Sequence, residues 1–267
     1  MDAQPPAVPL ECCVASAESA LAAERGGARC LELCDNLGEG GTTPSAGMLR
    51  TVVARVGIPV RVLIRPRGGD FVWSADELEV QLQDVDAARD AGAAGVVVGA
   101  LQPDGQLDGA ATRALVLRAR GGGGGGGGQR ALSVTFHRAI DMCRDPLECL
   151  RALLAIEGID RVLSSGGAAT APQGASMLAE MQAELQRGGH QLALMAGGGV
   201  AEDNAAALVR DTGVAMVHGT LRVKVDGAML WRKEGVTMGS SSAEEEFARR
   251  VTSAERVAAV VAALAES

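Results

Sequence analysis

The chain has 267 residues, of which 47% are hydrophobic and 22% are charged, and its formal net charge is −8. This length and hydrophobic content allow a sizeable core, whereas the acidic balance argues against nucleic acid or an anionic membrane surface as the main partner. Six cysteines in a chain this long, two of them adjacent at positions 12 and 13, do not form the spacing of a disulfide framework.

The N-terminal residues MDAQPPAVPL lack the basic and apolar regions of a secretory signal, and residues 1–7 are expected to be flexible. No stretch approaches the ~18 consecutive apolar residues that a transmembrane helix needs, so no membrane partner is expected. Together with the cysteine content, these features predict a reducing, cytoplasmic location, with the nucleus left open.

Short β-branched or leucine-rich runs alternate with amphipathic segments along nearly the whole chain. The expected strands are 8–14, 29–34, 60–65, 94–98, 131–137, 161–165, 192–197 and 214–218. The expected helices are 16–26, 45–55, 75–91, 108–120, 145–156, 172–187, 201–210 and 243–265. Eight strand–helix units predict an α/β fold: one parallel sheet closed into a single-domain (β/α)8 TIM barrel over residues 1–267.

Two segments depart from this regular alternation. Residues 121–128 are eight consecutive glycines, which cannot form a core and predict a flexible insertion in the loop after the fourth helix. Residues 219–243 are long for a strand-to-helix connection, and such excess length often forms a lid or a subunit contact. One structural interpretation therefore treats the protein as an oligomeric scaffold that uses 219–243 for contacts.

Several predicted strands have one apolar face and one face that becomes polar toward the carboxyl end. Because side chains alternate along a strand, the polar faces are expected to line the barrel and open at its C-terminal mouth, where barrel enzymes keep their active sites. These faces carry Glu11 and Cys13; Cys30, Glu32 and Cys34; Arg61, Leu63 and Arg65; and Ser133, Thr135 and His137. The plain alternative is a polar interior satisfied by internal Glu–Arg pairs, although such pairs contribute little net stability.

Long blocks of the sequence resemble the CutC copper-homeostasis family. The blocks are Glu11-Cys12-Cys13, ELCDNLGEGGTTPS (32–45), IRPRGGDF (64–71), VTFHRAIDM (134–142), RVLSSG (161–166) and MAGGGV (195–200). The resemblance runs from about residue 10 to the C-terminus and implies a (β/α)8 barrel, a dimer or higher homo-oligomer such as a tetramer, and a role in Cu(I) binding or trafficking. The glycine run at 121–128 departs from the family pattern.

The resemblance places the family's candidate copper ligands at Cys13 and Cys34. Soft thiolates select Cu(I), and neighbouring parallel strands lie roughly 4.8 Å apart, so two sulfurs could share one ion. The same closeness would permit a disulfide, and both residues could equally be ordinary buried cysteines. Nearby glutamates disfavour the thiolate form, whereas nearby arginines favour it.

Other polar residues at the expected mouth suit the chemistry of an enzyme. Glu11, Glu32, His137 and Asp141 are candidate catalytic acid–base groups, and His218, which ends the eighth strand, is a weaker one. Arg65, Arg67 and Asp70 form a loop that suits a carboxylate or phosphate ligand, or that balances the charge of the glutamates. Gly198 and Gly199 follow the seventh strand, where barrels often bind phosphate through backbone N–H groups, although a tight turn needs glycine anyway.

The sequence therefore leaves two functions open. In the first, the protein binds Cu(I) through Cys13 and Cys34 and acts in intracellular copper handling. In the second, it is an enzyme that acts on an anionic small molecule, which arginines hold and Glu or His groups protonate or deprotonate.

Overall fold

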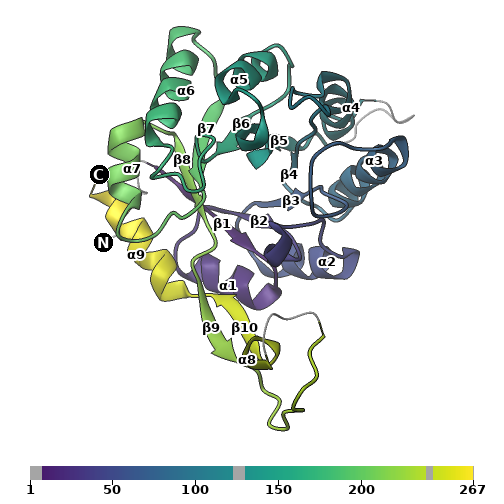
Figure 1. The fold of residues 1–267 in the computed structure, drawn as a ribbon, viewed down its shortest axis with the longest axis vertical. Coiled ribbons are helices and arrows are strands. Elements are labelled where there is room, and N and C mark those ends of the chain that lie inside the picture. The colour runs from purple at the N-terminus through teal and green to yellow at the C-terminus, as the bar shows by residue number, and fades with distance from the viewer. Residues whose placement is uncertain (1–7, 123–129, 239–242, 267) are drawn as a thin grey trace.

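The computed structural model describes residues 8–122, 130–238 and 243–266, and it confirms the predicted TIM barrel (Figure 1). Eight parallel strands form a closed barrel in chain order, and the eighth pairs with the first. The strands are β1 (Leu10–Val14), β2 (Cys30–Leu33), β3 (Val60–Leu63), β4 (Gly95–Val98), β5 (Ser133–Phe136), β6 (Arg161–Ser164), β7 (Ala193–Gly197) and β8 (Met216–Gly219). The predictions made for residues 1–7 and for glycines 123–128 lie outside the described residues.

Helices follow the strands and surround the barrel (Figure 1). They are α1 (Ala17–Arg25), α2 (Ala46–Arg55), α3 (Ala75–Asp90), α4 (Gly109–Ala119), α5 (Pro146–Leu154), α6 (Ala175–Arg187), α7 (Ala205–Thr212) and α9 (Ala254–Ala265), with short 3-10 turns η1 (Leu37–Glu39) and η2 (Arg138–Met142). Ser16, Ser45 and Ser74 each accept a hydrogen bond from the backbone N–H three residues later, and Asp145 precedes Pro146 at the start of α5, which fixes where these helices begin.

The two faces of the strands divide the core as alternation predicts. Leu10, Cys12 and Val14 of β1 belong to the large apolar cluster that lies between the sheet and the helices. Inside the barrel, two small clusters contain Cys13, Cys34, Leu63 and Val97, and Cys30, Leu163, Met195 and Met216. Charged side chains of β1, β2 and β3 share this interior, so the polar groups are buried without interrupting the outer core.

The predicted helix over 243–265 is wrong in its first half. The chain instead forms a four-residue helix α8 (Ala243–Glu246) and a strand β10 (Ala248–Thr252), which pairs antiparallel with β9 (Arg222–Asp226). Val223 and Val225 of β9 alternate with charged residues, a period of two that favours a strand. The side chain of Ser253 accepts a hydrogen bond from the N–H of Arg256 and starts α9 only after this strand.

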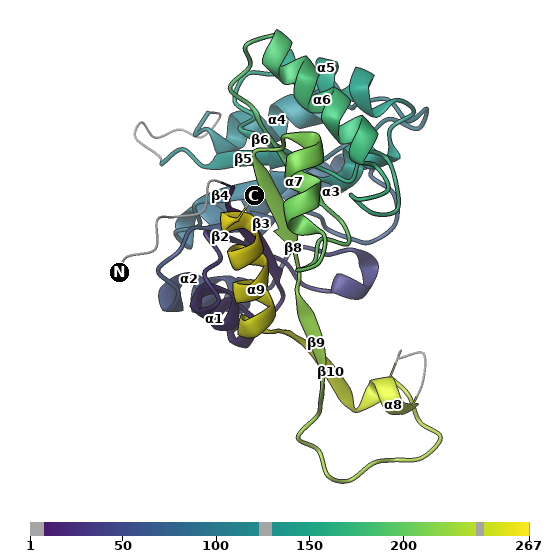
Figure 2. The ribbon, with the colours of Figure 1, turned by 90° about the vertical axis from the view of Figure 1, so that its left-hand side faces the viewer.

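The β9–β10 ribbon carries the long connection away from the barrel (Figure 2). Beyond the ribbon, the segment that contains Leu230, Trp231 and Met238 exposes large apolar side chains, and Leu230 is 97% exposed. We call residues 227–238 the arm. Among the helices of the described ranges, none is long and apolar enough to cross a membrane.

Candidate functional site at the barrel mouth

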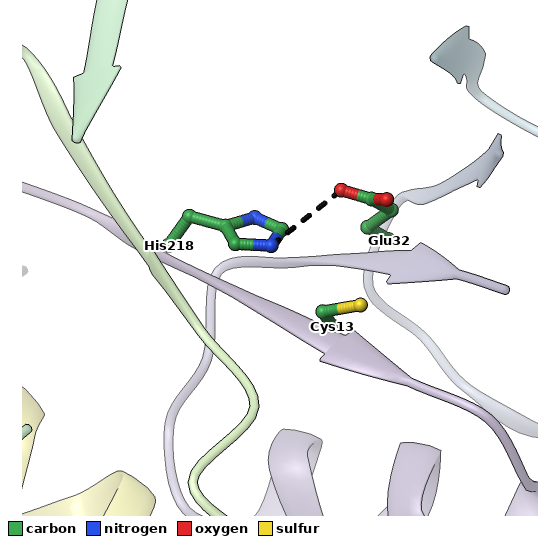
Figure 3. Close-up of side chains that lie close together, drawn as sticks. All are labelled: Cys13, Glu32 and His218. Carbon is green, nitrogen blue, oxygen red and sulfur yellow. Dashed lines mark ion pairs between the residues drawn. The ribbon is translucent and has the colours of Figure 1, made fainter. Parts of the chain in front are cut away.

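A thiol, a carboxylate and an imidazole meet inside the mouth of the barrel (Figure 3). Cys13 of β1 lies beside Glu32 of β2 in the sheet register, and His218 of β8 lies beside Glu11 of β1. The ligand atoms of Cys13, Glu32 and His218 lie within 4.8 Å of one another, and all three side chains are buried. Closure of the barrel creates this site, because it brings the last strand against the first.

Cys34 adds a second thiol to this group. Its Sγ lies 3.5 Å from Sγ of Cys13, whereas a disulfide bond is ~2.05 Å long, and both residues are free cysteines. Cys34 is fully buried and does not line the cavity, whereas Cys13 does. We call Cys13, Glu32, Cys34 and His218 the floor cluster.

Below the floor cluster, Glu11 joins three interior side chains. Its Oε2 accepts hydrogen bonds from Arg61 at 3.0 Å and from the Cys30 thiol at 3.4 Å, and its Oε1 lies 3.2 Å from Nδ1 of His218. Burial alone would raise the pKa of Glu11, but the hydrogen bond and charge of His218 and the charge of Arg61 outweigh burial and lower the pKa to about 2. Glu11 is therefore a fixed negative charge.

Glu32 behaves differently from Glu11 although both carboxyls are buried. Burial and the charge of Glu11 raise the pKa of Glu32 to about 7, against the opposing charge of His218. Its Oε2 lies 3.6 Å from Nε2 of His218 and has no hydrogen-bond partner among the described residues. Glu32 can therefore exchange a proton near neutral pH, or offer an oxygen to a ligand.

The remaining floor groups respond to the same surroundings. The contact with Cys34, burial and the charge of Glu32 all raise the pKa of Cys13 well above its ordinary value. Burial would lower the pKa of His218, but the charges of Glu32 and Glu11 and the hydrogen bond to Glu11 outweigh burial and raise it. The surroundings thus favour the thiol form of Cys13 and shift His218 toward its protonated form relative to a free imidazole.

A cavity of about 480 Å³ opens above the floor cluster. Its described lining contains the arginines Arg65, Arg138, Arg222, Arg250 and Arg256, the histidines His137 and His218, and a single carboxylate, Glu32. We call these five arginines, together with the loops that follow β7 and β8, the basic rim. The rim is rich in cationic groups although the whole chain carries a net charge of −8, and three of its arginines, Arg138, Arg250 and Arg256, pair with carboxylates outside the lining.

The predicted arginine loop after β3 is used mainly for structure. The guanidinium of Arg65 donates to the carbonyl oxygens of Glu39, Gly41 and Gly69, at 2.7 to 2.8 Å, and lies over Phe71. Arg67 lies outside the cavity lining and pairs with Glu77 and Asp70, and the Asp70 side chain is mostly exposed. The structure therefore brings Arg65 into the cavity but not Arg67 or Asp70.

The predicted acid–base groups after β5 are also separated. His137 lines the cavity, but its Nδ1 accepts the backbone N–H of Ala139 at 3.1 Å, and burial together with the charge of Arg65 lowers its pKa to about 3. Asp141 lies outside the lining, where it accepts hydrogen bonds from Ser164, Ser165 and Gly167 and pairs with Arg138 at 2.7 Å. Asp141 thus positions Arg138.

Sequence reasoning gave too little weight to His218 and found Arg65 but not the other four rim arginines as site residues. The signal for His218 was available: it ends the last strand, and a closed barrel places that strand beside β1, which carries Glu11 and Cys13. Arg138 stands next to the predicted His137 in sequence. Arg222 and Arg250 come from the β9–β10 ribbon, which the sequence reading did not predict.

The fold and the site define a class of protein: a parallel (β/α)8 barrel with a thiol–carboxylate–imidazole cluster at the C-terminal mouth of its strands. The sequence profile of the CutC family matches residues 8–223, and the chain belongs to that family.

Two curated proteins and one solved structure illustrate the relationship. A CutC family protein of Chromobacterium violaceum is 44% identical over 96% of this chain and 97% of its own length. The mouse copper homeostasis protein cutC homolog is 41% identical over 93% of this chain and 86% of its own length. The crystal structure of a copper homeostasis protein CutC from Streptococcus agalactiae superposes with a TM-score of 0.71 at 28% identity, covering 80% of this chain and 98% of that one.

Proposed function

We propose that this chain binds Cu(I) as a cargo between Cys13 and Cys34 and acts in intracellular copper handling. The observation that carries the proposal is the 3.5 Å separation of two free thiols, one of which lines an open cavity. Soft sulfur ligands favour Cu(I) over harder ions. The names of the relatives, which describe copper homeostasis proteins in mouse and Streptococcus agalactiae, support the same assignment.

The other floor groups fit such a cargo. Glu32 Oε2 is buried without a hydrogen-bond partner in the described part of the chain, and Nε2 of His218 lies beside it, so either group can complete the ligand set. Binding as thiolate releases the thiol protons, so Cu(I) affinity rises with pH. The high pKa of Cys13 extends this rise above neutral pH.

The test is a competitive titration with Cu(I) and a chromophoric Cu(I) chelator under anaerobic, reducing conditions. Cys13→Ser/Cys34→Ser should bind Cu(I) at least ~100-fold more weakly than the wild type, because both soft ligands are lost. Cys143→Ser/Cys149→Ser is the matched control: it also removes two of the six cysteines, but these two lie outside the barrel interior, directly after η2 and on α5. Equal affinity of the wild type and the Cys13/Cys34 variant would exclude the proposal.

The proposal includes a cytoplasmic location, a single domain over 1–267 and a homo-oligomer. The exposed apolar side chains of the arm support the oligomer, because monomeric proteins rarely expose such patches. Leu230→Asp and Trp231→Asp should lower the molar mass measured by light scattering, whereas Lys233→Asp in the same arm should not. An unchanged mass in both apolar variants would remove this support.

A second candidate function is an enzyme that moves a proton on an anionic small molecule. The observation that favours it is the pair of Glu32, with a pKa near 7, and His218 at 3.6 Å in one cavity. Proton exchange into small anionic metabolites in D2O, followed by NMR, tests it. Exchange with the wild type should disappear in Glu32→Gln, and a complete absence of exchange in the wild type would speak against it.

A further inference from the structure

The upper part of the cavity is rich in arginine, above the sulfur and carboxylate groups of the floor cluster. Five arginines and one described carboxylate line the cavity, and three of the arginines pair with carboxylates outside the lining, which leaves Arg65 and Arg222 without an ion-pair partner in the described ranges. A cleft lined by one sign of charge concentrates ligands of the opposite sign. The rim therefore suits a ligand with an anionic group, whether the floor cluster binds a metal ion or exchanges a proton.

Backbone donors are concentrated on one side of this rim. Five consecutive or neighbouring residues after β7 and β8 line the cavity, and their N–H groups have no hydrogen-bond partner among the residues that the structure describes. They are Gly198, Gly199, Val200, Thr220 and Leu221. Backbone N–H groups that face an open cavity can bind water or a ligand, and this number of donors in one place suits a ligand with several acceptor oxygens.

The backbone of these loops is held in unusual conformations. The φ angles of Gly198 and Gly199 are +101° and +74°, and Leu221 has φ +47° although it carries a side chain. The Gly198 carbonyl accepts the N–H of Ala171 at 2.8 Å, so the Gly199 N–H in the same trans peptide points to the opposite side. The conformation is thus fixed by neighbouring structure before any ligand arrives.

Arginine side chains adjoin the same loops. Asp141 and Ser165 hold Arg138 through its Nε and one terminal nitrogen, at 2.7 Å each, while its other terminal nitrogen lies against Gly198. Arg222, at the start of β9, lines the cavity without an ion-pair partner in the described ranges. One preoriented and one unpaired guanidinium therefore stand beside the open N–H groups.

A further buried donor lies on the opposite wall. Because Nδ1 of His137 accepts the N–H of Ala139, the neutral ring carries its proton on Nε2, which has no hydrogen-bond partner in the described structure. His137 is 5% exposed and lines the same cavity. It can donate a hydrogen bond to the body of a ligand whose anionic group sits at the rim.

We propose that the rim is a binding site for a phosphorylated small molecule, with its phosphate held by the N–H groups of the loops after β7 and β8 and by Arg138 and Arg222. A phosphate monoester offers three terminal oxygens as acceptors, which match more of these donors than the two oxygens of a carboxylate. The cavity volume of about 480 Å³ suits a small metabolite. This site is separate from the proposed copper site. If the protein is an enzyme, as in the second candidate function, the same site makes its substrate a phosphorylated small molecule, and this last step rests on that candidate function.

Titration calorimetry with inorganic phosphate, in copper-free buffer of low ionic strength, tests the site. The wild type should bind one equivalent saturably, and Arg222→Gln should weaken binding about tenfold, through loss of a charge-assisted hydrogen bond. Arg249→Gln is the matched control, because Arg249 lies on β10 outside the cavity and pairs with Glu18. It should bind phosphate within about twofold of the wild type.

The outcomes separate this site from the other proposals. Cys13→Ser/Cys34→Ser and Glu32→Gln should bind phosphate like the wild type, even where copper binding or proton exchange is lost. Crystals grown with phosphate should place the anion beside Gly199, which does not depend on any variant folding. Absence of saturable binding in the wild type, equal weakening in Arg222→Gln and Arg249→Gln, or an anion located elsewhere would overturn the proposal.

Discussion

The floor cluster and the basic rim lie in one cavity but differ in the chemical groups that they present. The floor presents sulfur, carboxylate and imidazole side chains that three adjacent strands fix in register. The rim presents guanidinium groups and backbone N–H donors from loops and from the β9–β10 ribbon. Strands give the floor precise spacing, whereas loops give the rim its charge, so the two parts can serve different ligand groups.

The largest effect on stability is expected when a buried charge beneath the floor cluster is removed. Glu11→Gln leaves Arg61 buried without a negative partner, and we expect a loss of about 3 to 5 kcal/mol in the free energy of unfolding. Urea denaturation of the wild type and the variant measures this loss. A change below about 1 kcal/mol would mean that Arg61 reaches solvent or another partner.

The loop after β2 packs closely against the floor cluster at Gly41. A Cβ at Gly41, which has φ +95°, would lie 2.8 Å from Leu63 and 3.7 Å from the sulfur of Cys34. Gly41→Ala should therefore cost about 2 kcal/mol of unfolding free energy. Gly38→Ala in the same loop is the control, because its Cβ would meet nothing within 4 Å. Similar unfolding free energies of the two variants would show that the close packing of Gly41 against Leu63 and Cys34 does not contribute to stability.

The pH dependence of stability sharpens the contrast between the two glutamates. Between pH 4.5 and about 7, the folded protein binds a proton at Glu32 that the unfolded chain has released, so stability falls as pH rises through this window. The slope should approach about 1.4 kcal/mol per pH unit, the limit for one proton. Glu32→Gln should flatten it.

Glu11 changes stability with pH in the opposite direction. Its pKa is lowered, so its contribution to stability is complete above pH 4.5 and is lost as pH falls toward 2. Unfolding free energies measured across pH 3 to 8 for the wild type and Glu32→Gln distinguish the two groups. Equal slopes between pH 4.5 and 7 would contradict the raised pKa of Glu32.

The smallest effect is expected at an exposed ion pair. Glu18 and Arg249 lie 2.8 Å apart, but both side chains are more than half exposed. Glu18→Gln should change the free energy of unfolding by less than about 0.5 kcal/mol. A loss as large as that of Glu11→Gln would mean that burial does not decide the energy of ion pairs in this protein.

Much of the fold and part of the site follow from local sequence. Period-two alternation predicted that Glu11, Cys13, Glu32 and Cys34 face inward, because each strand has one uninterrupted apolar face. The serine caps predicted the helix starts for the same local reason.

Other parts depend on contacts that sequence order does not display. The hydrogen bonds of Arg65 to three backbone carbonyl oxygens decide that it holds loops together, and no pattern in IRPRGGDF reveals them. The ribbon was missed because Ala243 to Glu246 begins as a helix and hides the strand that follows. The rim arginines of that ribbon were missed with it.

The complete burial of Cys34, next to a Cys13 that lines the cavity, has a kinetic consequence for any ion held between them. An ion that enters through the cavity meets the sulfur of Cys13 first, so this residue sets the association rate. Cys34 instead prolongs the residence time of an ion that Cys13 has already captured. Exchange with an acceptor protein would therefore begin by displacement of the outer sulfur, with the inner one as the last bond to break.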